Sequence, residues 1–106
     1  MPLTISQSTT VNVSDTVSTT GNKLTISVAA TATEIAPANT NRKGLTIENK
    51  TGKDIFVGYA NTVTATNYSF SLPNNSYYEM PEPIYQGVIF GIVATGTAAP
   101  QITEFV

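Results

Sequence analysis

The sequence contains neither cysteine nor histidine. Without cysteine the chain forms no disulfide and no thiolate metal site. Without histidine it lacks the side chain that most often transfers protons near neutral pH, and also the commonest imidazole metal ligand. Serine is plentiful, but it has no histidine partner, and neither a Gly-x-Ser-x-Gly motif nor a glycine-rich phosphate loop occurs. We therefore expect a protein that is not an enzyme, with no catalytic residues and no cofactor.

Carboxylates are few, and their spacing does not suggest a site. Glu79 and Glu82 lie close together but in an extended segment, which gives them no reason to converge as the acid pair of a glycosidase. Asp15, Glu48 and Asp54 could offer oxygen atoms to calcium, but the regular acidic spacing of a calcium loop is missing. We expect solvated edge charges and no metal site.

Charged residues of both signs are also scarce, at 11% of the chain, with a net charge of −2. Such a chain has no basic field, so we expect no binding to nucleic acid. Its basic residues gather at one place, namely Arg42, Lys43, Lys50 and Lys53. We interpret this group as a solvated turn whose lysines protect a sheet edge, with an acidic docking partner as the alternative.

Long hydrophobic runs are missing as well. The longest apolar stretch, Val88 to Ala94, has the length of a strand and falls far short of the roughly 20 residues that span a bilayer. The first ten residues, MPLTISQSTT, have neither the basic head nor the apolar run of a signal peptide. We expect no membrane partner and no secretory targeting.

The sequence does have the alternation of β-strands, most clearly in its middle. Leu45 and Ile47 alternate with polar residues, and so do Ile55 and Val57. Lys50-Thr51-Gly52 between them predicts a three-residue hairpin loop with glycine at a left-handed position. That hairpin would place Ile47 opposite Ile55 and Leu45 opposite Val57, with both apolar pairs on one face.

Similar patterns recur along the rest of the chain. Further strands are predicted at residues 24–28, 33–35, 68–72, 77–80, 88–94 and 101–106. Turns are predicted at 19–22 and 73–75, and Pro81 to Pro83 predicts an edge or a connection. Seven or eight short strands without a helix predict an all-β fold, an antiparallel β-sandwich or a small β-barrel of jelly-roll-like form.

The first 22 residues differ from the rest in composition. Residues 1–22 are rich in serine and threonine, and Val11 and Val13 alternate as in a strand whose partner lies elsewhere. They carry too little apolar surface to offset the cost of ordering, roughly 1–2 kcal/mol per residue. We predict an extended N-terminal arm that lies on a neighbouring subunit, with a frayed terminus as the alternative. Residues 23–106 then form the β-sandwich domain.

The longest apolar stretch predicts a strand that is covered on both faces. Val88, Phe90 and Ile92 share one face, and Ile89 and Val93 share the other. One cover is the core of the domain. The second is another sheet, the arm, or another subunit.

Five tyrosines occur within 27 positions, and tyrosine suits both protein interfaces and stacking against sugars. Tyr77 and Tyr78 are adjacent, so they must point to opposite faces of a strand. Ordinary core and surface packing remains the alternative to an interface role. The residues that we predict at an interface are Val11, Val13, Tyr77, Tyr78, Tyr85, Ile89 and Val93.

Three motifs, NRKGLTIEN, IFVG and YYEMPEPIYQG, lie within residues 32–97. This stretch, about two thirds of the chain, resembles a group of small phage-encoded proteins. The resemblance implies a virion component, most often a head decoration or cement protein and sometimes part of a fibre.

The resemblance also implies partners and a location. It implies a homo-oligomer, for which we expect a trimer, bound to the major capsid protein or other virion proteins. It places the chain on the surface of the phage head after synthesis in the host cytoplasm. The alternative is a carbohydrate- or receptor-binding knob of a tail or fibre, which would need exposed tyrosines beside asparagine or aspartate in a groove.

Overall fold

The alternation of apolar and polar residues produces strands along most of the chain. The computed structural model describes residues 17–106, and this part contains ten strands and no helix. In chain order the strands are β1 (Gly21–Leu24), β2 (Val28–Ala29), β3 (Thr33–Ala36), β4 (Gly44–Asn49), β5 (Ile55–Gly58), β6 (Phe70–Leu72), β7 (Ser76–Glu79), β8 (Ile89–Ile92), β9 (Thr97–Ala98) and β10 (Gln101–Phe105). The predicted all-β fold is confirmed.

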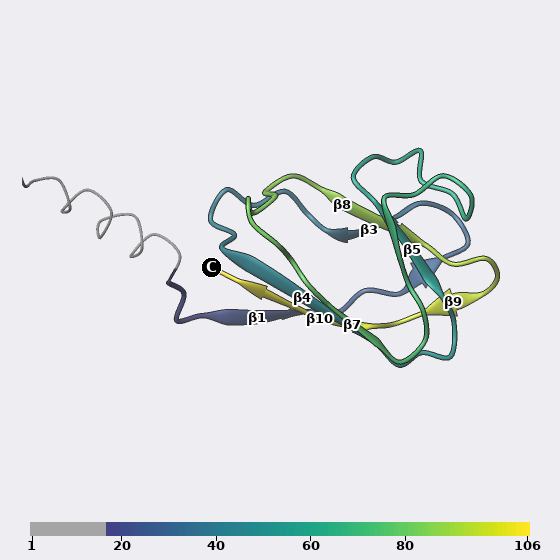
Figure 1. Ribbon diagram of the computed structural model, residues 1–106, viewed down its shortest axis with the longest axis horizontal. Coiled ribbons are helices and arrows are strands. Elements are labelled where there is room, and N and C mark those ends of the chain that lie inside the picture. The colour runs from purple at the N-terminus through teal and green to yellow at the C-terminus, as the bar shows by residue number, and fades with distance from the viewer. Residues whose placement is uncertain (1–16) are drawn as a thin grey trace, which may run out of the picture.

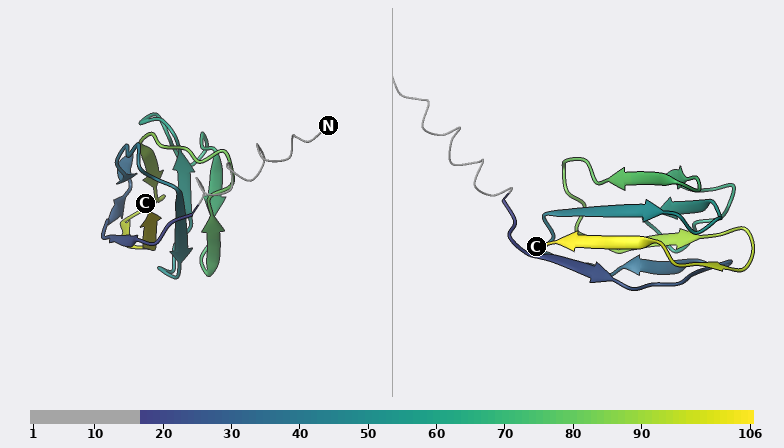
Figure 2. Two further views of the ribbon diagram at one scale, coloured as in Figure 1. Left: turned by 90° about the vertical axis from the view of Figure 1, so that its left-hand side faces the viewer. Right: turned by 90° about the horizontal axis from the view of Figure 1, so that it is seen from below.

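The strands form a sandwich of two antiparallel four-stranded sheets (Figures 1 and 2). The first sheet has the order β1-β10-β4-β7, and the second has the order β3-β8-β5-β6. A short third sheet pairs β2 with β9. With β2 and β9 left aside, consecutive strands lie in opposite sheets except for β5 and β6, and this is the strand order of a jelly roll. In this order β5 and β6 are consecutive strands that pair with each other.

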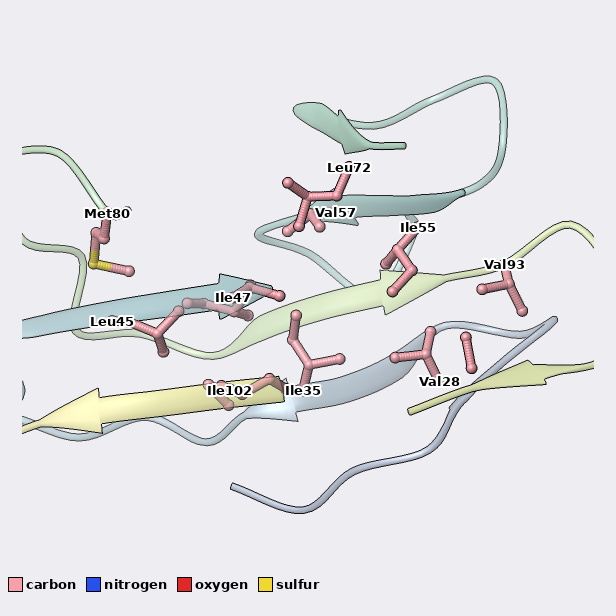
Figure 3. Close-up of a cluster of buried hydrophobic side chains, with 13 residues drawn as sticks. Val28, Ile35, Leu45, Ile47, Ile55, Val57, Leu72, Met80, Val93 and Ile102 are labelled. Carbon is pink, nitrogen blue, oxygen red and sulfur yellow. The ribbon is translucent and has the colours of Figure 1, made fainter. Parts of the chain in front are cut away.

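The core fills the space between the two main sheets (Figure 3). Leu45 and Ile47 of β4 enter it from the first sheet, and Ile35, Ile55 and Val57 enter it from the second. All five side chains are at most 2% exposed. Full burial of a side chain of this size contributes about 1.5–3 kcal/mol. The predicted inward faces of β4 and β5 are therefore confirmed.

The predicted hairpin between β4 and β5 is wrong, because these strands belong to different sheets. Ile47 lies opposite Ile102 of β10 and Tyr78 of β7, whereas Ile55 lies opposite Leu72 of β6. Both strands present apolar residues to one core, but they do so from opposite sides of it. Period-two alternation fixes which face is buried and says nothing about which strand is the neighbour.

Asn49 lies where the chain crosses from the first sheet to the second. This residue is fully buried at the end of β4, where its amide Nδ2 donates to the carbonyl oxygens of Lys53 and Leu72, both at 2.7 Å. Its Oδ1 accepts from the Thr51 hydroxyl, also at 2.7 Å. Gly52 has φ +87°, as predicted for this position. The segment 50–54 is thus an arch between the sheets, held by the Asn49 side chain and by a bond from the Gly52 N–H to Oδ1 of Asn74 at 2.8 Å.

The predicted turn at residues 19–22 is also wrong, because β1 begins at Gly21, which pairs with Phe105 of β10. A Cβ atom at Gly21 would lie 3.1 Å from the Phe105 ring. The glycine therefore serves close packing under an aromatic ring instead of a turn. The sandwich accordingly includes Gly21 and Asn22, which the sequence had placed in the arm.

The other predicted connections are present. Asn75 has φ +71° in the turn between β6 and β7, and Pro81 to Pro83 lie in the connection between β7 and β8. The described chain starts close to the C-terminus, because the Ser18 hydroxyl donates to the Val106 carbonyl at 2.6 Å. Val11, Val13 and most of the predicted arm lie outside the described residues, so the arm stays a prediction.

Candidate interaction surfaces

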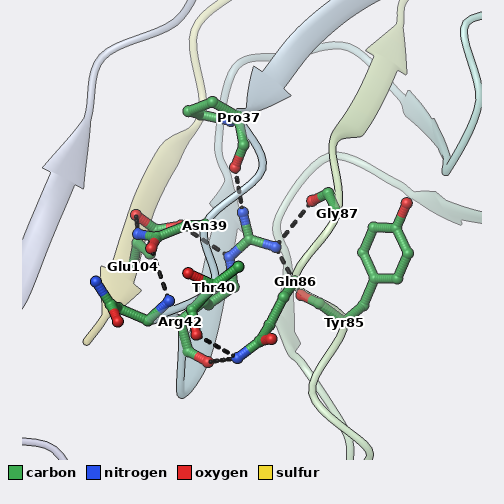
Figure 4. Close-up of polar contacts among 9 residues, drawn as sticks. Pro37, Asn39, Thr40, Arg42, Tyr85, Gln86, Gly87 and Glu104 are labelled. Atoms are coloured by element: carbon green, nitrogen blue, oxygen red, sulfur yellow. Dashed lines mark hydrogen bonds and ion pairs between the residues drawn. The ribbon is translucent and has the colours of Figure 1, made fainter.

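A buried ion pair closes one end of the sandwich (Figure 4). Arg42 is 1% exposed, and its Nε donates to Oε2 of Glu104 at 2.7 Å. Its Nη1 donates to the carbonyl oxygens of Tyr85 and Gly87, at 2.6 and 3.0 Å. Its Nη2 donates to the Pro37 carbonyl at 2.6 Å. One side chain thereby ties the β3–β4 connection to the β7–β8 connection and to β10.

The prediction that Arg42 belongs to a solvated turn is wrong, although its neighbours Lys43 and Lys50 are exposed. Glu104 shares the inner face of β10 with Ile102, so a carboxylate enters the edge of the core. A buried carboxylate needs a cation, and Arg42 supplies it. The position of Glu104, two residues after an apolar core position, was the signal in the sequence that could have identified this pair.

Two further side chains complete the network around Arg42. Asn39 donates from Nδ2 to Oε1 of Glu104 at 3.1 Å, and Gln86 donates from Nε2 to the carbonyl oxygens of Thr40 and Arg42. Throughout residues 17–106, every buried side-chain nitrogen or oxygen atom has a hydrogen-bond partner. The Arg42 and Glu104 side chains are thus engaged in holding loops, and the pair is a structural element of the fold.

A groove with a volume of about 580 Å³ lies at this same end of the sandwich. Its lining residues are Thr20, Thr40, Asn41, Arg42, Lys43, Glu82, Ile84, Gln86 and Val106. A neighbouring hollow of about 440 Å³ shares Lys43, Glu82 and Ile84 with it. Lys43 also donates from Nζ to the Val17 carbonyl at 2.9 Å, so the groove adjoins the place where the described chain begins. Its mixed polar lining suits contact with another polypeptide.

Tyr77 and Tyr78 point to opposite faces of β7, as predicted. Tyr77 is 62% exposed on the outer face of the first sheet, opposite Glu48 of β4. Tyr78 lies on the inner face, where its ring stacks on Phe70 of β6 with centroids 4.4 Å apart. Tyr78 thus packs within the sandwich, and only Tyr77 is freely available to a partner.

Ile89 and Val93 do not face a neighbouring subunit, and their predicted interface role is wrong. They are 2% and 1% exposed and belong to the core, because the face of β8 that carries them is the inner one. The opposite face carries Val88 and Phe90, which are half-buried, and Ile92, which is 8% exposed. The chain itself therefore covers much of both faces of this strand.

Tyr85, the remaining tyrosine with a predicted interface role, is 37% exposed in the connection between β7 and β8. Its ring packs edge to face on Tyr59, with centroids 4.7 Å apart. Tyr59 follows the end of β5 and is 39% exposed. The two rings brace each other and leave part of each accessible.

Burial raises the pKa of the Tyr78 hydroxyl, and the adjacent Tyr59 hydroxyl raises it further. An unfolded tyrosine titrates near pH ~10, so the unfolded chain loses this proton before the folded chain does. The contribution of neutral Tyr78 to stability is therefore complete below pH ~10 and is lost as the pH rises above that value. We expect Tyr78→Phe to flatten the alkaline fall in the free energy of unfolding, measured by urea titrations across this range. Tyr77→Phe is the matched control and should keep the wild-type slope; equal slopes for all three proteins would contradict the assignment.

A smaller groove of about 290 Å³ lies beside the loop that connects β5 to β6. Its lining residues are Gly58, Tyr59, Ala60, Thr62, Val63, Asn67, Tyr68 and Ser69. In Figure 1 this loop is at the upper right, on the side of the second sheet. In the sequence this segment lies between the strand predicted around Ile55 and Val57 and the strand predicted at residues 68–72, and no site was predicted in it. The signal in the sequence that could have indicated this groove is the pair Tyr59 and Tyr68, which bracket a loop rich in threonine and asparagine.

Within residues 17–106, no group of three or more histidine, cysteine, aspartate or glutamate side chains is arranged to hold a metal ion. The same part of the chain has no helix with the length and apolar character needed to cross a membrane. Comparison with protein-family models, curated proteins and solved structures found no match for this chain.

Proposed function

We propose that this chain is a non-enzymatic structural protein of a bacteriophage virion, which decorates the head and stabilises it by binding the major capsid protein. The resemblance of residues 32–97 to small phage proteins supports this role. The jelly-roll order of the strands is compatible with it, since viral capsid proteins use that architecture, as do lectins and cupins. A fold by itself does not assign a function, so the proposal rests on a surface of the molecule.

The exposure of Tyr77 is the observation that carries the proposal. At 62% it is the most exposed of the large apolar and aromatic side chains in residues 17–106. It lies on the outer face of the first sheet, beside Glu79 of its own strand β7 and Thr46 and Glu48 of the adjacent strand β4. Tyrosine is enriched at protein interfaces because it combines a large apolar ring with a polar tip. This face is the surface that we propose for attachment to the head.

The proposal also includes self-association into a trimer. Three linked copies would bind a symmetric shell far more tightly than one copy, because the first contact raises the effective concentration of the others. The N-terminal residues, with Val11 and Val13, would supply a second contact with the shell or with an adjacent subunit. The groove of about 580 Å³ beside Val17 lies where such a segment would leave the sandwich.

Binding to purified heads that lack this chain tests the proposal. We expect the wild-type protein to co-sediment with such heads and to raise the temperature at which they rupture. Tyr77→Ala should weaken this binding by about tenfold or more, which corresponds to about 1.4 kcal/mol. Because Tyr77 is a surface residue, its replacement should change folding stability by no more than about 0.5 kcal/mol.

Tyr68→Ala is the matched control, because Tyr68 is an exposed tyrosine in the β5–β6 loop, away from the first sheet. This variant should bind heads like the wild type. Failure of the wild-type protein to co-sediment would contradict a role on the head. An equal loss of binding in both variants would contradict the choice of the first sheet as the attachment surface.

A further inference from the structure

We propose that the groove beside the β5–β6 loop binds a neutral carbohydrate, through at least one pyranose ring. This site is distinct from the surface around Tyr77, and it does not depend on where the chain is located in a virion.

Two exposed tyrosines line the same groove, one at each end of the β5–β6 loop. Tyr59 is 39% exposed and Tyr68 is 44% exposed, and both border the volume of about 290 Å³. A pyranose ring has an apolar face of C–H groups and a rim of hydroxyl groups. Its apolar face can pack on a tyrosine ring, while the phenolic hydroxyl remains available for a hydrogen bond. The groove therefore offers both kinds of contact that a sugar requires.

Both rings are held in place by aromatic neighbours. Tyr68 packs on Phe56 with centroids 5.0 Å apart and an interplanar angle of 46°. Tyr59 packs on Tyr85 with centroids 4.7 Å apart and an angle of 61°. A ligand that binds to rings already fixed in position loses less free energy to ordering of side chains.

The loop that forms one wall of the groove is also preorganised. Val63 is 5% exposed and lies directly on Gly58, where a Cβ atom would be 3.0 Å from its Cγ2. Thr64 and Asn67 are joined by backbone hydrogen bonds, of which the one from the Thr64 N–H to the Asn67 carbonyl is 2.8 Å long. Glycine at position 58 therefore allows the loop to pack against the end of β5.

The polar groups of the groove suit sugar hydroxyls. Asn67 uses its backbone N–H to bond the Thr64 hydroxyl at 2.9 Å, and its exposed side-chain amide has no partner among residues 17–106. An amide offers both donors and an acceptor, so it can pair with adjacent hydroxyls that act in both ways. Thr62 and Ser69 add further hydroxyl groups to the lining.

The absence of charge from the lining narrows the class of ligand. None of the eight lining residues is lysine, arginine, aspartate or glutamate. A phosphate or a sialic acid is ordinarily bound by cationic side chains, and a basic peptide by carboxylates. The groove therefore favours an uncharged glycan over each of these ligands.

A glycan array probed with the labelled full-length chain tests this inference, followed by NMR titration with the neutral methyl glycosides that correspond to the positive spots. We expect binding to neutral glycans and shifts of the tyrosine ring signals. Asn67→Ala and Tyr68→Ala should each weaken binding by about tenfold or more. Tyr77→Ala, which alters an exposed tyrosine on the other sheet, should bind like the wild type. Asn67→Asp keeps the size of the side chain and removes its amide donors, so it separates the hydrogen bond from any effect on folding.

Three results would overturn the inference. The first is an array without signal above background. The second is unchanged glycan binding in both groove variants, which would place any binding elsewhere. The third is a preference for sialylated glycans, for phosphorylated glycans or for peptides over neutral sugars. Thermal melting of each variant, followed by circular dichroism, identifies any variant that has lost its fold. If Asn67→Ala or Tyr68→Ala has lost its fold, the glycan binding of Asn67→Asp decides whether the inference holds.

Discussion

Replacement of Arg42 by alanine should lower the free energy of unfolding by about 3–5 kcal/mol, the largest effect that we expect for a single substitution in residues 17–106. The change would leave the Glu104 carboxylate buried beside Ile102 without its cation. It would also remove the donors to the carbonyl oxygens of Pro37, Tyr85 and Gly87. Urea unfolding followed by circular dichroism measures the loss directly.

Two further variants show whether the loss comes from the ion pair. Lys43→Ala removes the adjacent basic residue, which is exposed, and should change stability by no more than about 0.5 kcal/mol. The double variant Arg42→Met with Glu104→Leu replaces both charges by apolar groups, and it should recover the part of the loss that comes from an uncompensated buried charge. The part that comes from the carbonyl oxygens of Pro37, Tyr85 and Gly87, which stay without a donor, should remain. A change of less than about 1 kcal/mol in Arg42→Ala would contradict the structural role of the pair.

Replacement of Asn49 by alanine should lower the free energy of unfolding by about 2–4 kcal/mol, the second largest effect. Alanine would remove both amide hydrogen bonds that join β4 to the carbonyl oxygens of Lys53 and Leu72, and also the acceptor for Thr51. Carbonyl groups left buried without a donor keep their full desolvation penalty. The same urea titration provides the measurement.

Asn41→Ala is the matched control for this prediction. Asn41 is exposed next to the buried Arg42, and its replacement should leave stability within about 0.5 kcal/mol of the wild type. If Asn49→Ala were as stable as Asn41→Ala, the arch between the sheets would not depend on the buried amide of Asn49.

The positions of most strands, and the faces that they bury, could be predicted from the sequence. Leu45, Ile47, Ile55 and Val57 reach the core as their alternation required, because a period of two fixes the buried face. The partners of these strands could not be predicted in the same way. A short loop between two amphipathic strands fits a hairpin and an arch equally well. The bonds that hold the arch join Asn49 to Leu72 and Gly52 to Asn74, residues more than 20 positions apart, so local patterns do not reveal them.

The candidate surfaces were predictable only in part, for a similar reason. Opposite orientation of Tyr77 and Tyr78 follows from strand geometry alone. The inward direction of Ile89 and Val93 depends on which face of β8 meets the first sheet, and the strand is apolar on both faces. Burial of Arg42 depends on Glu104, which lies 62 residues further along the chain. The groove beside Tyr68 exists because β5 pairs with β6, a partnership that local patterns do not specify.

The central claim is that this chain acts through its surfaces as a component of a phage head. Electron microscopy of virions that carry the chain, labelled with gold-conjugated antibodies against residues 17–106, tests it most directly. We predict label distributed over the head, and its loss from particles assembled with Tyr77→Ala. Label confined to the tail or fibres, or particles without label, would contradict the claim.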